Sequence, residues 1–203
     1  MALIEGGGGG PAVFLDKDGT LVEDVPYNVD PARMKLVSGA SEALHRLHAA
    51  GFALVVVSNQ SGVARGMFPV EALEPVRRRL DELFRLAGSC LSGFYFCPHL
   101  PDADDPRYGV VCECRKPAPG LLLQGAEDLG LDLRASWMVG DILDDVEAGN
   151  RAGCRSVLVG TEHETEWMWT PERRPWGVAP DLAAAADLVL AATRVAPQDR
   201  RSA

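Results

Sequence analysis

A short apolar run that ends in two aspartates is the feature of this sequence that most constrains its fold. The four apolar residues 12–15 are followed by Asp16-Lys17-Asp18-Gly19-Thr20. Such a run predicts a buried strand, and Asp-Gly predicts the turn that ends it. Because side chains two positions apart on an extended chain leave from the same face, Asp16 and Asp18 can address one substrate atom and one metal ion together. An ordinary acidic turn is the alternative, so the other strand ends must decide.

The rest of the chain alternates between predicted strands and predicted helices. Apolar runs predict strands at 52–58, 93–97, 137–140 and 155–159. Apolar residues at helical spacing predict helices at 41–50, 69–87, 119–129, 145–152 and 182–192, the last a helix or a strand plus a helix. Alternation of this kind indicates an α/β fold, a Rossmann-like doubly wound parallel sheet with helices on both faces. The segments 98–114 and 160–180 are interpreted as loops.

Length and composition fit one soluble domain. With 203 residues, we expect a single domain over 11–193, a disordered polyglycine leader at 1–10 and a flexible polar tail at 194–203. The leader lacks the features of a signal peptide and no apolar run approaches a membrane span, so we expect a cytoplasmic location. The net charge of -9 argues against nucleic acid or an anionic membrane as a partner. We expect a monomer, because no amphipathic surface element is left over.

Polar residues at other predicted strand ends complete a candidate active site. Ser58 and Asp141 follow two strands, and Lys116 precedes a helix that can reach the same crevice. The set suits phosphoryl transfer, with Asp16 as nucleophile and Asp18 as general acid and then base. Ser58 would donate a hydrogen bond to the phosphoryl group, and Lys116 would offset negative charge. Asp16, Asp141 and the backbone carbonyl of Asp18 would bind Mg²⁺, which prefers oxygen ligands. Singly, each residue could be a turn residue, a solvated lysine or an acidic first helical turn.

Three of the five cysteines indicate a second metal. An odd count in a reducing compartment disfavours a disulfide framework. Three thiolates and one imidazole would form a closed tetrahedral zinc site of structural type, pinching the base of the loop 97–114. Its ligands would be Cys97, His99, Cys112 and Cys114. Buried cysteines beside an incidental histidine are the alternative. Cys90 and Cys154 have no other cysteine or histidine near them at the spacing of metal ligands, and we expect them in the core.

Taken in order, these motifs resemble the haloacid dehalogenase superfamily of phosphatases. The matching segments are 16–20, 58–60, 115–117 and 140–145, which span most of the chain. The resemblance implies an Mg²⁺-dependent phosphatase that forms an aspartyl-phosphate. Asp18 separates phosphatases from the dehalogenases of that superfamily, which lack the second aspartate. Thr20 and Asp145 would support the site. In this superfamily the residue at the position of Asp145 usually supports the metal site, and Asp144 is the alternative for that role.

The cysteine-clipped loop before Arg115 is similar to that of the subgroup of heptose bisphosphate and histidinol phosphatases. This resemblance implies that Arg115, Asn59 and Arg65 contact the substrate beyond the transferred phosphate. The implied substrate is a small phosphorylated sugar, heptose 1,7-bisphosphate, which would lose its C7 phosphate. Histidinol phosphate or another sugar phosphate is the alternative, and a zinc-stabilised sugar-phosphate-binding protein is the non-enzymatic one. No large cap insertion is visible, and Ile142 stands where the family pattern leads us to expect a basic residue.

Overall fold

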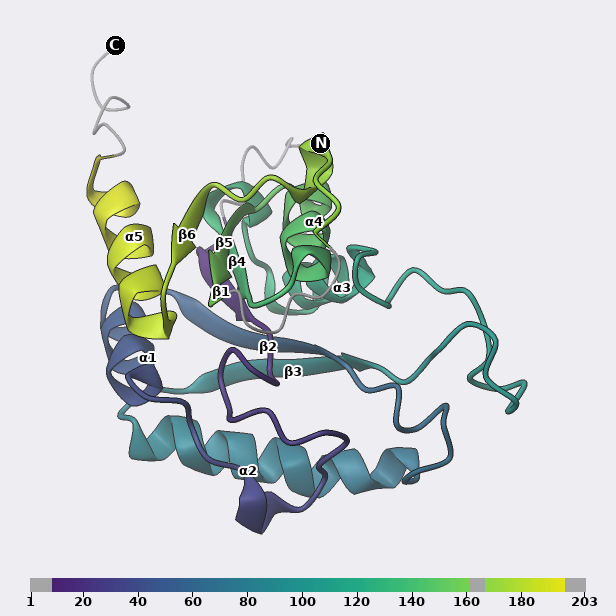
Figure 1. Cartoon of the computed structure of the whole chain (residues 1–203). Helices are drawn as coiled ribbons and strands as arrows, with labels where there is room; N and C mark the ends of the chain where they lie inside the picture. Colours follow the sequence, from purple (N-terminus) through teal and green to yellow (C-terminus); the bar gives the residue numbers. More distant parts are fainter. Residues whose placement is uncertain (1–8, 161–166, 196–203) are drawn as a thin grey trace, which may run out of the picture.

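A six-stranded parallel sheet forms the centre of the protein (Figure 1). The structure is a computed structural model that describes residues 9–160 and 167–195. The strands are β1 Ala12–Leu15, β2 Ala53–Asn59, β3 Leu91–Cys97, β4 Trp137–Gly140, β5 Arg155–Val159 and β6 Gly177–Ala179. Their order across the sheet is β3-β2-β1-β4-β5-β6. Successive strands are therefore added first on one side of β1 and then, from β4 onward, on its other side. Doubly wound sheets bind ligands beyond the carboxyl ends of their strands at such a switch point.

Helices cover both faces of this sheet (Figure 1). The α-helices in the described ranges are α1 Ala40–Ala49, α2 Leu73–Leu86, α3 Gly120–Leu129, α4 Leu143–Ala152 and α5 Leu182–Val195. Buried residues of α1, α2 and α5 share an apolar cluster with Val13 and Leu15, whereas those of α3 and α4 pack with Ala12 and Phe14. Alternate residues of β1 therefore face opposite layers, as the period of a strand requires. The predicted doubly wound α/β sheet is confirmed.

The predicted helix over 69–87 begins later than expected. Residues Val70–Ala72 form a short 3-10 turn, and the α-helix starts only at Leu73. Pro75 explains the delay, because proline lacks an N–H and is tolerated only in the first turn of an α-helix.

The predicted loop at 160–180 is the largest error in the predicted fold. It contains a 3-10 turn, Pro171–Arg173, and the sixth strand, β6. The strand is held partly by the segment before it, where the Trp176 N–H donates to the Ser156 carbonyl over 2.8 Å. The Trp176 ring also meets Trp137 edge to face, with centroids 4.9 Å apart. A three-residue strand beside a proline-rich segment carries too little periodicity to be seen in the sequence.

The same segment leaves large apolar side chains on the surface. Trp167, Trp169 and Trp176 are each about half exposed in the structure. The reason given for a monomer, that no surface element is left over, therefore does not hold here, and the oligomeric state stays a prediction.

The ends of the predicted domain lie close to the limits of the described residues. Gly10 already pairs with Leu131 in a β-bridge, so order begins before the predicted boundary at residue 11. The remainder of the leader and most of the tail lie outside the described residues, and the boundaries 11–193 stay predictions. Within 9–160 and 167–195, no helix combines the length and apolarity needed to cross a membrane.

Close packing of α4 on the sheet yields a first prediction. A Cβ on Gly149 would lie 2.4 Å from Ser156 Oγ and 2.5 Å from Met138 Cβ. We expect Gly149→Ala to lower the free energy of unfolding by about 1–3 kcal/mol, because overpacking forces backbone shifts. Urea unfolding measures this change, and Gly10→Ala is the matched control, since a Cβ there meets nothing within 4 Å. If the two variants were equally stable, α4 would not be packed as tightly as described.

Candidate active site

Two aspartates meet at the switch point because they follow neighbouring strands. Asp16 follows β1 and Asp141 follows β4, and these strands pair in register, with Leu15 opposite Val139. The Asp16 N–H continues this pairing by donating to the Val139 carbonyl over 2.9 Å. Asp145, from the first turn of α4, joins them, and one oxygen from each of the three carboxylates lies within 4.8 Å of the others. All three side chains are buried.

Lys116 supplies a positive charge inside this group. Its ammonium pairs with Asp16, lies 2.6 Å from Asp145 Oδ1 and donates to the Val57 carbonyl over 3.1 Å. The side chain is only 2% exposed, and a buried ammonium is tolerated only with such partners. Burial by itself would lower the pKa of Lys116, but Asp145 and Asp16 outweigh it and raise the pKa. Lys116 is therefore a fixed cation.

Asp145 lies closer to the centre of the site than its predicted supporting role requires. Its Oδ2 accepts a 3.3 Å hydrogen bond from the Ile142 N–H, which fixes it at the start of α4. Burial raises the pKa of Asp145 to about 7, with Lys116 opposing and the charges of Asp16 and Asp141 adding to the shift. Three carboxylates this close repel one another unless a cation relieves them.

The donor set of the site fits a divalent cation with a preference for oxygen. The described residues bring together four carboxyl groups and two buried ammonium groups, so acidic groups outnumber cations there. These groups are Asp16, Asp18, Asp141 and Asp145, with Lys17 and Lys116. Carboxylate oxygens are the ligands that Mg²⁺ uses, so the residues present match that ion. Thr20 orients one of them, because its hydroxyl donates to Asp141 Oδ1 over 3.1 Å.

Asp18 is held by a different pair of side chains. The Lys17 ammonium pairs with its Oδ1, and Gln60 Nε2 donates to its Oδ2 over 3.3 Å. Burial raises the pKa of Asp18 above its ordinary value, although Lys17 opposes this shift and Asp16 adds to it. A raised pKa suits a carboxyl group that must deliver a proton.

Ser58 and Gln60 form the polar end of β2. The Gln60 amide donates to the Ser58 hydroxyl oxygen over 2.8 Å, and both side chains are buried. Sequence analysis did not identify Gln60 or Lys17 as candidates. Gln60 lies two residues beyond Ser58, so the rule that placed Asp16 with Asp18 could have found it. Lys17 could have been found as a cation between two acids.

The three predicted substrate contacts lie outside this buried group. Arg115 donates to the His99 carbonyl over 3.2 Å, across the base of the loop 97–114. Arg65 is exposed, with its guanidinium carbon 5.9 Å from the centroid of the Tyr27 ring. Asn59 differs from expectation, because its amide makes two 3.0 Å hydrogen bonds with the Lys116 backbone, one in each direction. Asn59 is thus placed to hold Lys116, and its contact with substrate stays a prediction.

A pocket opens beside Asp18. It has a volume of about 250 Å³, and its lining includes Asp18, Tyr27, Asn59 and Gln60. A phosphorylated group in this pocket would meet the Asp18 carboxyl directly. Arg65 lies over the ring of Tyr27, one of the residues that line this pocket.

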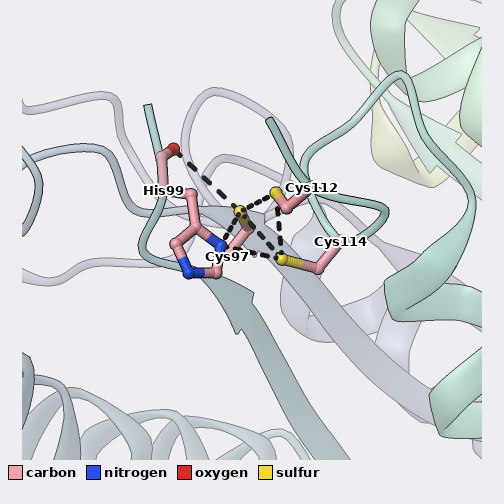
Figure 2. A group of neighbouring side chains, drawn as sticks. All are labelled: Cys97, His99, Cys112 and Cys114. Carbon is pink, nitrogen blue, oxygen red and sulfur yellow. Dashed lines mark hydrogen bonds between the residues drawn. The ribbon is translucent and has the colours of Figure 1, made fainter. Parts of the chain in front are cut away.

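The four predicted zinc ligands converge into one cluster, shown in Figure 2. The Cys114 Sγ lies 3.1 Å from Cys97 Sγ, 3.3 Å from Cys112 Sγ and 3.2 Å from His99 Nδ1. The Cys97 Sγ lies 3.6 Å from both Cys112 Sγ and His99 Nδ1. Tetrahedral zinc with bonds of about 2.3 Å to sulfur separates its ligand atoms by about 3.7 Å. The cluster is therefore already close to the size that zinc requires, and it could bind that ion.

Comparison with known proteins places this chain among hydrolases. The HAD-hydrolase-like family model, where HAD stands for haloacid dehalogenase, matches residues 113–185. D-glycero-beta-D-manno-heptose-1,7-bisphosphate 7-phosphatase of Yersinia pestis is 43% identical over 152 residues, covering 74% of this chain and 81% of the relative. The Escherichia coli K12 protein of the same name is 39% identical over 167 residues, covering 78% of this chain and 87% of the relative.

Solved structures agree with these sequence relatives. A HAD-like phosphatase from Mesorhizobium loti superposes with a TM-score of 0.79 at 35% identity, covering 95% of this chain and 90% of the other. The D,D-heptose 1,7-bisphosphate phosphatase of B. bronchiseptica, solved with magnesium and phosphate, gives a TM-score of 0.72 at 31% identity, covering 90% and 99%. The fold and the site thus define a HAD-like hydrolase. Specifically, the chain belongs to the HAD-like family that contains the heptose bisphosphate phosphatases, and the predicted superfamily is confirmed.

The link between Asn59 and Lys116 yields a second prediction. We expect Asn59→Ala to lower the free energy of unfolding by about 1–3 kcal/mol, because it leaves two backbone groups of Lys116 without partners. Hydrolysis of a phosphate ester should fall as well, since the ammonium loses its fixed position. Asn59→Asp retains the acceptor for the Lys116 N–H and should cost less stability. Thermal unfolding and kcat of the two variants measure these effects, and a wild-type kcat for Asn59→Ala would contradict the positioning role.

Proposed function

We propose that this protein is an Mg²⁺-dependent phosphatase that removes the C7 phosphate of D-glycero-D-manno-heptose 1,7-bisphosphate. The observation that carries the proposal is the buried group of Asp16, Asp141 and Asp145 around the Lys116 ammonium at the switch point of the sheet. The substrate is inferred from relatives at 39–43% identity, whose names give that sugar bisphosphate.

In the first half of the proposed reaction, a carboxylate oxygen of Asp16 attacks the phosphorus atom. The bond between phosphorus and the sugar oxygen breaks, and Asp18 gives its proton to that oxygen. Lys116 pairs with Asp16 and compensates the charge of the phosphoryl group, while the Ser58 hydroxyl donates to a phosphoryl oxygen. The products are an aspartyl-phosphate at Asp16 and a sugar that carries a free hydroxyl group at C7.

In the second half, Asp18 acts as a base. Its carboxylate removes a proton from water while the water oxygen attacks the phosphorus atom. The bond between phosphorus and Asp16 breaks, which releases phosphate and restores both aspartates. Asp18 returns to its protonated form, ready for the next substrate molecule.

The proposed magnesium ligands are Asp16, Asp141 and the backbone carbonyl of Asp18, with Asp145 beside them. When bound, Mg²⁺ would contribute charge neutralisation at the phosphoryl group, which is the main demand of phosphoryl transfer. We also propose that the cluster of Cys97, His99, Cys112 and Cys114 binds a structural zinc ion. Support for zinc is the near-tetrahedral spacing of the four ligand atoms.

A substrate panel tests the proposed function. We expect phosphate release from heptose 1,7-bisphosphate with a kcat/KM at least about tenfold above that for fructose bisphosphate or histidinol phosphate, because a matched site discriminates by differential transition-state binding. Asp16→Asn should lower kcat by roughly 10³-fold or more, since the nucleophile is lost. The exposed Asp128→Asn is the control and should behave as wild type. A preference for histidinol phosphate would reject the proposed substrate, and turnover by Asp16→Asn would reject the nucleophile.

Zinc content is tested independently. We expect about one zinc ion per purified chain by elemental analysis, and its loss in Cys112→Ser, since the tetrahedral set would lack one thiolate. Thermal stability should fall too, because metal binding is coupled to folding of the loop. Cys90 lies outside the cluster and is exposed, so its predicted place in the core is wrong, and Cys90→Ser should retain both zinc and stability. Wild-type protein purified without zinc would count against this site.

A further inference from the structure

Lysine is rare in this protein and is concentrated at the site. The sequence has three lysines, Lys17, Lys35 and Lys116, against seventeen arginines. Lys35 is exposed, whereas Lys17 and Lys116 are each only 2% exposed. Lys116 has a role in the proposed reaction, but Lys17 has none so far. Because burying an ammonium costs several kcal/mol, its position needs a reason.

The backbone around Lys17 fixes where its side chain begins. Its carbonyl accepts from the Leu21 N–H over 3.1 Å and from the Val22 N–H over 2.9 Å. Gly19 allows this tight turn, since its φ of 84° lies in the left-handed region that other residues avoid. Lys17 is therefore not a mobile surface lysine that happens to touch a neighbour.

With the Lys17 ammonium, both carboxylate oxygens of Asp18 have a partner. Lys17 holds Oδ1, and Gln60 holds Oδ2 at 3.3 Å. Gln60 is itself fixed, because its amide donates to Ser58 and its backbone N–H donates to the Cys97 carbonyl over 2.7 Å. A carboxylate held at both oxygens has a defined plane, and Asp18 is one of the residues that line the adjacent pocket.

We propose that Lys17 is a positioning residue for Asp18, orienting it for proton transfer to the leaving oxygen. This inference rests on the proposed phosphatase function. As the bond between phosphorus and the sugar oxygen breaks, Asp18 gives up its proton and gains a negative charge. That charge forms beside the Lys17 ammonium, which compensates it without moving. Lys17 thus acts through Asp18 and makes no bond to the substrate.

Dependence on the leaving group separates this role from a merely structural one. A sugar alkoxide needs a proton in order to leave, whereas p-nitrophenolate leaves without one. We expect Lys17→Met to lower kcat/KM for heptose bisphosphate by about 10- to 100-fold and that for p-nitrophenyl phosphate by less than about threefold. The ratio of the two constants, measured in one preparation, does not depend on how much of the protein is folded. Lys35→Met is the matched control and should leave the ratio unchanged.

A double-mutant cycle tests whether Lys17 acts through Asp18. Asp18→Asn should shift the same ratio, and adding Lys17→Met to it should cause no further change, because the two residues act as one unit. Lys17→Gln serves as a second neutral variant if Lys17→Met gives too little soluble protein. An equal loss on both substrates, or a full additional loss in the Asp18→Asn background, would overturn the inference. If wild type hydrolysed neither substrate, the proposed function itself would be rejected.

Discussion

The ion pairs of the buried Lys116 ammonium are the interaction on which the functional end of this fold depends. They join three segments that are distant in sequence: the end of β1 with Asp16, the first turn of α4 with Asp145, and the stretch before α3 that carries Lys116 itself. None of these three charged groups could be buried alone, because an uncompensated charge in a protein interior costs several kcal/mol. The pairs therefore stabilise one another, and their geometry would determine where a phosphoryl group is held in the proposed reaction.

The cysteine cluster is directly connected to residues of the candidate active site. Cys97 is the last residue of β3, and its carbonyl receives the Gln60 N–H, so this ligand is tied to the residue that holds Asp18. Cys114 lies two residues before Lys116, so the cluster and the buried ammonium are joined by a very short stretch of chain. The loop 97–114 extends away from the sheet, yet its two ends are fixed next to the site (Figure 1). A metal that closes this loop would thus steady the site from both sides.

Sequence reasoning succeeded where topology determines position. Asp16 and Asp141 could be placed together because parallel strands present their carboxyl ends at one edge, and apolar runs reveal such strands. It failed where position depends on a single long-range contact. The amide of Asn59 turns toward the Lys116 backbone, and the amide of Gln60 reaches Asp18, but nothing in the local sequence specifies these distant partners. The strand β6 was missed for a related reason, since its three residues depend on pairing with β5.

The distribution of basic residues follows from what each cation can do. Several arginines lie in ion pairs on helix surfaces, as where Arg77 bridges Glu74 and Asp81 on α2. Their planar, five-donor groups suit such forks. The cations beside Asp16 and Asp18 are lysine ammonium groups, and an ammonium is a compact point charge on a flexible stem. In the proposed reaction these two lysines would compensate negative charge at Asp16 and Asp18, so an acidic protein would need no basic surface to bind an anionic substrate.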